Sequence, residues 1–535
     1  MTTSSAPGEP PSRQDPAGRP PLHSIGAIAA PAYLTRRQVL IGIGATGALV
    51  TVGGLAACTR NPSAPGGQPA PGSATPSPEF AEPDVLASEN GRLEVNLRAA
   101  AATVAYGGVT RWALTYNGST PGPTLRVRPG DDLTIVLENG LDAPTNLHTH
   151  GLHVSPEGDS DNVFVMVEPG ETHTYRYRIP ADHPSGTFWY HPHHHGQVAT
   201  QVFGGLAGAI IIEDAIDQLP ALAAATSRVL VLADPNIGDS DAVLGGSMMD
   251  AMFGREGNAI VINGQNRPRL RAGTGTLEHW RLVNASPSRY YALSVDGLQM
   301  HLVASDAGRL DRPRPVDEVV LVPGERAEVL IALDDAGTHR LVTRTVDRGG
   351  MGMMGGGGGM GNGRGPSSAT TEIATLEISG DPAPSPDLPD HLADVRTLPD
   401  EEVTDTRTVI LAMGMGMGMG MGMGGGDGQF TIDGRSFDPN RVDITARIDT
   451  TEDWTIRNTS PMDHPFHLHV WPFQVIDTSD GTEPPDGWKD TVNVPAGQSV
   501  TIRIPFRGFA GKTVYHCHIL DHEDLGMMGI IDTQP

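Results

Sequence analysis

Short stretches in which apolar and polar residues alternate recur along most of the chain. Examples are LTIVLEN at 133–139, YRYRIP at 175–180 and VTIRIPF at 500–506. Successive side chains of a β-strand point to opposite faces, so each stretch predicts a strand with one buried face. Dipeptides such as NG, DG and PG bound these stretches and predict tight turns. The pattern therefore favours many short strands over helices.

The chain contains three copies of one unit. The copies begin YNGSTPGPTLRVRPGDDLTIVLEN, INGQNRPRLRAGTGTLEHWRLVN and IDGRSFDPNRVDITARIDTTEDWTIRN, and each continues through further alternating stretches separated by glycine turns. Such a string of strands is typical of a Greek-key β-sandwich. We therefore predict an all-β fold of three tandem sandwich domains, at residues 84–214, 226–380 and 400–535.

Histidines recur at equivalent positions in the first and third copies. Counting nine and eleven residues from the asparagine that ends the shared strand, or five and seven from the glycine of the last strand, gives four His-x-His pairs: His148 and His150, His191 and His193, His467 and His469, and His516 and His518. The same counts in the middle copy give Leu293, Val295, Val342 and Arg344. We expect the middle domain to carry no metal ligand.

The four pairs predict a metal cluster between the first and third domains. Residues i and i+2 of a strand share a face, so each pair projects two imidazoles in one direction. Eight imidazoles without a carboxylate suit copper better than calcium or magnesium, and they are too many for one tetrahedral zinc ion. We therefore expect a cluster of several copper ions.

Cys517, between His516 and His518, predicts a second copper site. Its side chain points to the opposite face from its two neighbours, into its own domain, where it can meet His464, His522 and Met527. One thiolate, two imidazoles and a weak thioether form the ligand set of a blue-copper site. The His-Cys-His tripeptide would then join this site covalently to the cluster.

The motifs HTHG, HPHHHG, HPFHLH and HCHILDHEDLGMM, in this order, resemble the copper-binding motifs of three-domain multicopper oxidases, and the repeat extends the resemblance over residues 84–535. The resemblance implies cupredoxin-like domains, reduction of O2 to water, and four copper ions per chain: one type 1, one type 2 and two type 3. It implies ligands as follows: His148 and His467 for type 2; His150, His191 and His518 for one type 3 ion; His193, His469 and His516 for the other; and His464, Cys517, His522 and Met527 for type 1.

Reduction of O2 consumes protons, so an acidic residue beside the cluster is expected. Glu523 and Asp161 match positions that supply protons in related oxidases. Asp159 is a rival to Asp161 because the loop after HTHG varies in length. A solvated loop carboxylate without a catalytic role is the simpler interpretation of either aspartate.

Three further residues lie close to the motifs. Met528 is an alternative to Met527 as the weak ligand, although the resemblance favours Met527. His194 and His195 extend the run HPHHHG. We expect both to be structural or to support a ligand, because no neighbouring strand carries a further histidine pair that would need them as partners.

The N-terminal region resembles an export signal. Arg36 and Arg37 precede an apolar run that ends in LAAC, as in a twin-arginine signal (1–57) joined to a lipoprotein cleavage box. Cys58 would then be the lipidated first residue of a flexible Pro- and Ser-rich tether (58–83). An uncleaved membrane anchor is the alternative. We expect a lipoprotein on the outer face of the cell membrane or in the cell envelope.

Charge and methionine content bear on the substrate. The formal charge of −26, with 63 acidic and 37 basic residues, excludes a typical nucleic-acid-binding protein and favours cationic substrates. Of the 19 methionines, 13 lie in MGMMGGGGGMG after Gly350, in MGMGMGMGMGMGGG from Met413, and in the stretch that contains Met248, Met249 and Met252. We expect the tract from Met413 to precede the first strand of the third domain. Thioethers prefer Cu(I), although a low-complexity linker is the alternative interpretation.

Three functions compete. The first is a monomeric cuprous oxidase that confers copper resistance, with O2 and Cu(I) as substrates. The second is a laccase-like oxidase of phenols and aromatic amines, or a ferroxidase. The third is a non-catalytic cupredoxin scaffold or copper store, which would have no need of a complete ligand set.

Overall fold

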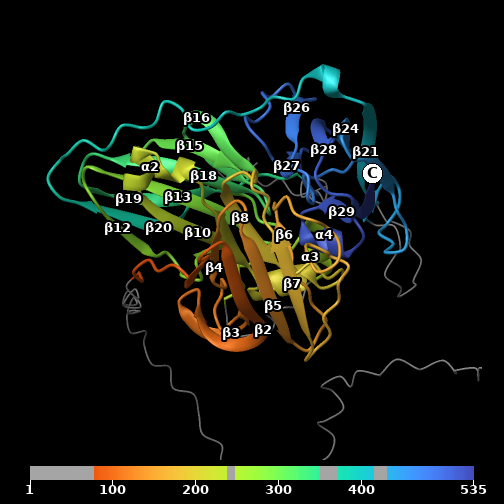
Figure 1. Ribbon diagram of the computed structural model, residues 1–535. Coiled ribbons are helices and arrows are strands. Elements are labelled where there is room, and N and C mark those ends of the chain that lie inside the picture. Colours follow the sequence, from red (N-terminus) through yellow and green to blue (C-terminus); the bar gives the residue numbers. More distant parts are fainter. Residues whose placement is uncertain (1–76, 238–246, 350–369, 415–429) are drawn as a thin grey trace, which may run out of the picture. The chain divides into compact units, whose positions relative to one another are not determined.

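The structure is a computed structural model that describes residues 77–237, 247–349, 370–414 and 430–535 (Figure 1). The signal and lipidation site predicted at 1–58, and most of two methionine-rich tracts, lie outside these residues. Contacts place residues Thr75–Pro535 in one compact unit. Within the described residues of that unit, the strands form six sheets.

Two sheets come from the first part of the chain and form the first sandwich. The strand orders are β1-β4-β9-β8-β6 and β3-β2-β5-β7. The strands are β1 (Val85–Ala87), β2 (Arg92–Tyr106), β3 (Val109–Tyr116), β4 (Thr124–Val127), β5 (Asp132–Gly140), β6 (His148–His150), β7 (Thr172–Arg178), β8 (Gly186–His191) and β9 (Gly208–Ile212). In β5 the alternating Leu133, Ile135 and Leu137 are fully buried, and each contributes about 1.5–3 kcal/mol to the core.

The middle sandwich has the strand orders β11-β10-β13-β18-β15-β16 and β12-β20-β19-β14-β17. Its strands are β10 (Thr226–Ala233), β11 (Val261–Ile262), β12 (Arg269–Gly273), β13 (Thr276–Asn284), β14 (Tyr291–Val295), β15 (Met300–Ser305), β16 (Gly308–Val316), β17 (Val319–Leu321), β18 (Arg326–Leu333), β19 (Gly337–Arg344) and β20 (Thr370–Ser379). Leu293 and Val295 on β14 are buried in its core, so apolar packing occupies the positions where the other copies carry histidine.

The third sandwich has the strand orders β22-β21-β24-β28-β26 and β23-β30-β29-β25-β27. Its strands are β21 (Asp405–Met413), β22 (Phe430–Ile432), β23 (Ile444–Arg447), β24 (Thr450–Asn458), β25 (His464–Leu468), β26 (Gln474–Thr478), β27 (Thr491–Val494), β28 (Ser499–Phe506), β29 (Gly511–Cys517) and β30 (Met528–Gln534).

The methionine-rich tract does not precede the first strand of this sandwich, as we expected from the sequence. β21 already belongs to it, and Met413 is the last residue of β21, paired with Phe430 of β22. The apolar run TVILAM continues through Met413, whose side chain packs against the core. The tract therefore interrupts a hairpin inside the sandwich.

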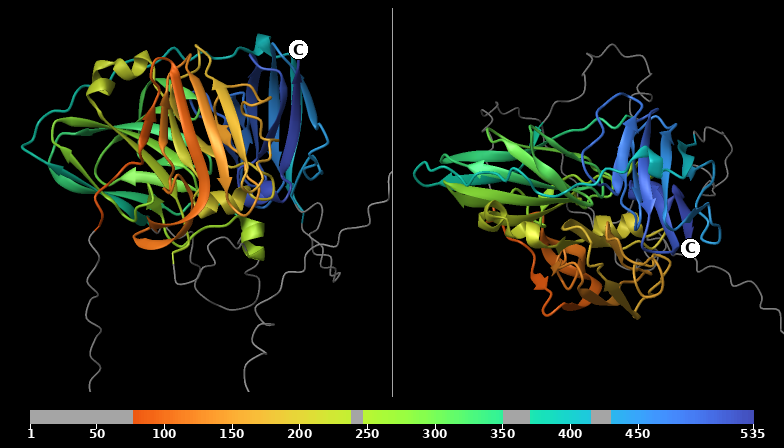
Figure 2. Two further views of the ribbon diagram at one scale, coloured as in Figure 1. Left: turned by 60° about the horizontal axis from the view of Figure 1, so that its bottom comes forward. Right: turned by 45° about the horizontal axis from the view of Figure 1, so that its top comes forward.

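In the part of the chain that the structure describes, four short α-helices lie among the strands: α1 (Val198–Gly204), α2 (Pro220–Ala224), α3 (Met248–Phe253) and α4 (Leu520–Asp524). Two 3-10 turns in the same part cover Ala215–Gln218 and Asp400–Glu402. Val198, Ala199 and Val202 of α1 pack on Leu520 of α4, a contact between the first and third sandwiches. Figure 2 shows these two sandwiches, orange to yellow and blue, beside each other. No helix among the described residues is long and apolar enough to cross a membrane.

Candidate metal centres

The four His-x-His pairs lie on strands that meet between the first and third sandwiches. In the first sandwich β6 pairs with β8, so that His148 is opposite His191. In the third sandwich β25 pairs with β29, so that His467 is opposite His516. The first pairing brings His148 and His150 beside His191, and the second brings His467 beside His516.

The eight histidines of these pairs are buried and form one cluster. The His148 ring stacks on the His469 ring with centroids 3.9 Å apart, and the His150 ring stacks on the His467 ring at 3.8 Å. Each stack joins one residue of the first sandwich to one of the third. The cluster therefore depends on the contact between the two sandwiches.

One group of three matches a predicted type 3 set. The Nε2 atom of His516 lies 3.2 Å from Nε2 of His193 and 3.0 Å from Nε2 of His469. In the second predicted set, the ring centroids of His150, His191 and His518 lie 5.0–5.9 Å apart. The centroids of His148 and His467, the predicted type 2 ligands, lie 5.9 Å apart, and His469 approaches both within ligand reach.

Four of these eight rings, those of His148, His150, His191 and His467, have one nitrogen held by the protein and one left without a hydrogen-bond partner among the described residues. Nδ1 of His148 donates to Asp161, Nδ1 of His191 donates to the carbonyl of Pro192 at 2.9 Å, and the Nε2 atom of each is buried and unpartnered. Orphaned buried imidazole nitrogens are costly unless they bind a metal. The donor set fits copper.

Burial also keeps these histidines neutral. It lowers the pKa of His191 to about 3 and that of His467 to about 4, and it lowers the pKa of the other six well below the ordinary value, with further lowering from neighbouring histidines. A neutral imidazole presents the lone pair that a metal ligand needs.

A second group surrounds Cys517 inside the third sandwich. Its Sγ atom lies 3.4 Å from Nδ1 of His464 and 3.8 Å from Nδ1 of His522, and the two Nδ1 atoms are 3.3 Å apart. Burial raises the pKa of the Cys517 thiol well above its ordinary value, so in this pocket a bound cation is needed to hold the thiolate.

The two candidate methionines lie in different surroundings. Met527 is fully buried and packs in the same hydrophobic cluster as Cys517. Met528 packs in another cluster, with Val163 and Val514. Met527 is therefore the methionine placed toward the Cys517 group.

The structure separates the two candidate aspartates. Asp161 is buried, and its carboxylate accepts a hydrogen bond from Nδ1 of His148 at 2.9 Å and others from Thr149. Burial raises the pKa of Asp161 to about 7. Asp159 is exposed and pairs with Arg176. Of the two, Asp161 is the acid beside the cluster.

Glu523 lies on the other side of the cluster, on α4. Its Oε2 atom is 3.1 Å from Nδ1 of His516 and its Oε1 atom is 3.5 Å from Nε2 of His193. Both contacts lack hydrogen-bond geometry, so each carboxylate oxygen is buried without a partner among the described residues. Burial, with a contribution from Asp524, raises the pKa of Glu523 well above its ordinary value.

Two neighbouring histidines stay outside the cluster. His194 is half-buried, and His195 is exposed, with its ring 4.6 Å from that of Phe437. Neither belongs to a group of side chains close enough to hold a metal ion among the described residues.

Sequence reasoning missed Asp490, which precedes β27. Its Oδ1 atom accepts from Nε2 of His150 at 3.1 Å, and its carbonyl accepts from Nδ1 of His467 at 2.8 Å. No motif or spacing marked this residue, because a loop of the third sandwich brings it to a histidine 340 residues away in the chain.

Known proteins resemble the chain over all three sandwiches. Family models described as multicopper oxidase match residues 98–217, 236–353 and 417–535. The chain is 30% identical over 427 residues to "Multicopper oxidase mco" of Staphylococcus haemolyticus, covering 78% of this chain and 83% of that protein. It is 28% identical over 436 residues to "Cell division protein FtsP" of Dickeya dadantii, covering 78% and 84%.

Among solved structures, a multicopper oxidase from Campylobacter jejuni described as a metallo-oxidase aligns with a TM-score of 0.75 at 31% identity, covering 86% of this chain and 96% of that one. The prediction of an all-β fold of three cupredoxin-like sandwiches is confirmed.

Proposed function

The chain belongs to the multicopper oxidase family, and from this we propose that it is a cuprous oxidase that confers copper resistance at the cell envelope. Four Cu(I) ions each give up one electron, and one O2 takes up these electrons with four protons to give two waters. The oxidoreductase class follows from the family.

The resident copper ions would be held by the twelve predicted ligands. We assign His464, Cys517, His522 and Met527 to type 1 copper, and the eight cluster histidines to the type 2 and type 3 ions in the sets that the resemblance implies. Bound copper would supply one-electron redox chemistry at the first site and four-electron reduction of O2 at the second.

The chain's own residues arrange this chemistry in two ways. Cys517 lies between His516 and His518, so three consecutive residues link the two sites. The nitrogens and the thiol of these residues are buried, which excludes bulk water from both sites.

Asp161 and Glu523 would supply protons from opposite sides of the cluster. Burial favours the protonated form of both carboxyl groups. Asp161 holds its proton next to His148, and Glu523 holds its proton next to His516 and His193.

The observation that carries Cu(I) as the donor is that all three methionine-rich segments are anchored beside the type 1 ligands. On α3, the carbonyl of Met252 lies 3.2 Å from Nε2 of His522. The ring of Phe430, directly after the tract at 415–429, stacks on His522 with centroids 4.3 Å apart.

The third segment begins at the same place. Gly349, directly before the segment at 350–369, forms a β-bridge with Met462, and the N–H of Asp463 donates to the carbonyl of Arg348 at 2.8 Å. Asp463 precedes His464 in the sequence. The described residues that flank or belong to all three methionine-rich segments therefore lie beside the proposed type 1 ligands, which supports Cu(I) as the donor.

A laccase-like or ferroxidase activity uses the same residues and remains the second candidate. The burial of His522 beneath α3 counts against bulky phenols, because both His464 and His522 are inaccessible to a large donor. Fe(II) prefers harder oxygen ligands to thioethers. The scaffold interpretation, which the resemblance to a cell division protein keeps open, requires no bound copper and no oxygen consumption.

We also propose that the chain is exported by the twin-arginine route, is anchored through lipid at Cys58, and acts as a monomer. The sequence motifs at Arg36, Arg37 and Cys58 support the first two statements. Mass analysis of the mature N-terminus tests them, and an unmodified Cys58 in membrane-free protein contradicts the anchor.

Oxygen consumption by the copper-loaded protein tests the donor. We expect kcat/KM for Cu(I) to exceed those for Fe(II) and for a bulky phenol, and Met249→Leu to lower it for Cu(I) alone. Met166→Leu is the matched control, because Met166 (52% exposed) and Met249 (51%) are equally accessible, and Met166 lies in a loop of the first sandwich. Preference for the phenol would favour the laccase interpretation, and no turnover with any donor would favour the scaffold.

A further inference from the structure

The described residues of the middle sandwich include none of the twelve predicted ligands, yet its backbone touches the cluster. Gly324, in the turn before β18, has a φ of +87°, and a Cβ atom there would lie 2.8 Å from Nε2 of His518. A side chain at this position would push the imidazole aside. The middle sandwich therefore forms part of the wall that holds the histidines in place.

Arg326, two residues further on, is buried and uses all five of its N–H groups. Nε donates to the carbonyl of Thr187 at 3.1 Å, and the carbonyls of Gly324 and Asp306 take one donor each from Nη1 and Nη2. The other two donors form a bidentate pair with Asp490, at 2.8 and 2.6 Å. Arg326 thus joins β8 of the first sandwich to the third sandwich.

Asp490, which pairs with Arg326, also forms hydrogen bonds with one histidine of the first sandwich and one of the third. Its carboxylate accepts from His150 and its carbonyl accepts from His467, whose rings stack at 3.8 Å. Each hydrogen bond leaves the other ring nitrogen free: Nδ1 of His150 and Nε2 of His467 are both buried and have no hydrogen-bond partner among the residues that the structure describes. Asp490 therefore determines which nitrogen of each ring faces the cluster.

The glycine of HTHG makes room for this ion pair. A Cβ atom at Gly151 would lie 2.3 Å from Nη2 of Arg326 and 2.6 Å from Oδ2 of Asp490, and the φ of +87° also favours glycine. The glycine of the HTHG motif is therefore explained by its contact with the middle sandwich, and the two histidines of the motif by metal binding.

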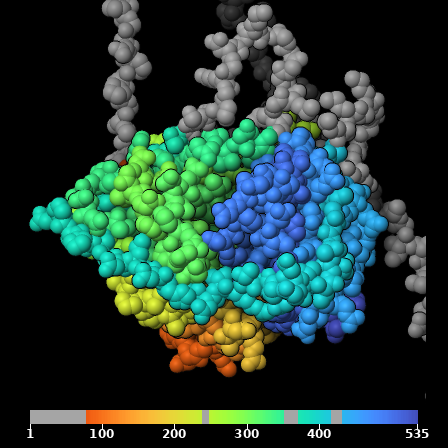
Figure 3. All heavy atoms as spheres, turned by 90° about the horizontal axis from the view of Figure 1, so that it is seen from above, coloured from red at the N-terminus to blue at the C-terminus, as the bar shows by residue number. Residues whose placement is uncertain are grey.

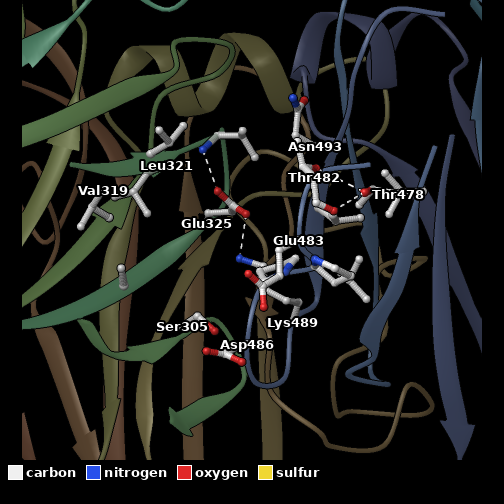
Figure 4. Close-up of a pocket in the computed structure, with 18 of the residues that line it drawn as sticks. Ser305, Val319, Leu321, Glu325, Thr478, Thr482, Glu483, Asp486, Lys489 and Asn493 are labelled. Carbon is white, nitrogen blue, oxygen red and sulfur yellow. Dashed lines mark hydrogen bonds and ion pairs between the residues drawn. The ribbon is translucent and has the colours of Figure 1, made fainter. Parts of the chain in front are cut away.

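A cavity of about 640 Å³ between the middle and third sandwiches reaches the same ion network (Figure 4). On its wall Nζ of Lys489 lies 2.8 Å from Glu325 and 3.0 Å from Asp306. Figure 3 shows these two sandwiches side by side on one face of the molecule. Lys489 is already paired with these two carboxylates, so it cannot replace the planar, bidentate guanidinium at Asp490.

We propose that Arg326 is a positioning residue: through Asp490 it orients His150 and His467 toward the copper cluster, and so gives the middle sandwich a role in copper binding. The inference rests on the proposed ligand assignment. Loss of a hydrogen-bond partner behind a metal ligand typically lowers metal affinity about 10- to 100-fold.

Arg326→Lys tests the inference, with Arg281→Lys as the matched control. Arg281 is a buried arginine of the same sandwich that pairs with Glu328 and Asp217 at 2.8 Å and touches no cluster histidine among the described residues. Copper content and the electron paramagnetic resonance of type 2 copper are measured on copper-loaded protein. We expect Arg326→Lys to alter the type 2 signal and to weaken retention of that ion at least about 10-fold, with the blue type 1 absorption unchanged.

Asp490→Asn keeps the shape of the side chain and is the second variant, used also if Arg326→Lys does not fold. It should weaken retention of the type 3 ion that His150 is assigned to hold, because the amide cannot accept from both Arg326 and His150 as the carboxylate does; copper content measures this loss. Copper content and a type 2 signal both as in Arg281→Lys, in either folded variant, would overturn the inference and leave the proposed function intact. A wild-type protein without type 2 copper would overturn the ligand assignment, and this inference with it.

Discussion

At the scale of single residues, Cys517 has the sharpest expected effect. Cys517→Ser should abolish the intense blue absorption, because only the thiolate gives type 1 copper its charge-transfer band. Turnover should fall by more than about 100-fold, because removal of a ligand should cost more than removal of a hydrogen bond behind a ligand. The ligands of the cluster are the eight histidines and not Cys517, so the cluster should still bind copper. Absorption spectra and copper analysis check both expectations, and retained blue colour would contradict the type 1 assignment.

Glu523→Gln separates proton supply from electron entry. The amide keeps the shape of the carboxyl group but cannot release its proton, so O2 reduction should slow by about 100-fold or more. Anaerobic reduction of type 1 copper, followed by loss of blue colour under stopped flow, should change little. Asp159→Asn serves as the control, since Asp159 is exposed and paired with Arg176. Equal slowing of both steps in Glu523→Gln would remove Glu523 as a proton source.

The sequence predicts single residues well where a repeat fixes their spacing. The four His-x-His pairs, Cys517 and His464 follow from strand alternation, which is a local rule. The choice between Asp159 and Asp161 does not follow, because it depends on how a loop folds back onto His148. Asp490 and Arg326 could not be found either, since their roles arise from contacts between sandwiches.

At the scale of elements, the hairpin of β21 and β22 carries the methionine-rich tract. Met413 and Phe430 form the pair of this hairpin nearest the tract, so deletion of 415–423 leaves the residues of both strands in place. Blue colour and copper content should stay unchanged, while kcat/KM for Cu(I) should fall roughly tenfold or more if each lost thioether contact is worth about 1 kcal/mol. A bulky organic donor should react as well or better.

Replacing the five methionines of 415–423 with leucine is the matched control for this deletion. Leucine keeps the length and apolar character of the tract but cannot bind Cu(I), so the variant should lose the same activity as the deletion. Full Cu(I) activity in the leucine variant would make the tract a linker. Equal losses with both donors would indicate damage to the fold.

Strands were predictable as elements because their alternation is strong, whereas α3 and α4 were not. Each has only five or six residues, too few to show a helical period or to form alone. α4 is stabilised by its packing on α1. These two short helices nevertheless bring Met252 and Glu523 to the copper ligands.

At the scale of the whole molecule, the buried histidines make the stability of the copper-free protein depend on pH. Burial lowers the pKa of His464 and His191 to about 3 and that of His467 to about 4, from an ordinary 6.5. Below pH 6.5 these histidines bind protons in the unfolded chain but not in the folded chain, so the free energy of unfolding decreases as the pH falls. As the pH falls below 6.5, each such histidine lowers the free energy of unfolding by up to about 1.4 kcal/mol per pH unit, until the pH reaches the pKa of that histidine in the folded chain.

Denaturant unfolding of copper-free protein at pH 7.0, 6.0 and 5.0 measures this loss. Copper bound only by the folded state should raise stability at every pH where it stays bound. A free energy of unfolding that is constant from pH 7 to pH 5 would contradict the neutral, buried state of the histidines.

The meeting of the first and third sandwiches also determines when copper can be acquired. His193 and His516, whose Nε2 atoms nearly touch, are 323 residues apart in the chain, and contacts between such distant residues form late because the long loop must close first. A growing chain that has not yet reached β29 (Gly511–Cys517) lacks His516 and His518 of the cluster and Cys517 of the second site. We therefore expect the complete set of copper ions to be bound only after the third sandwich has folded against the first.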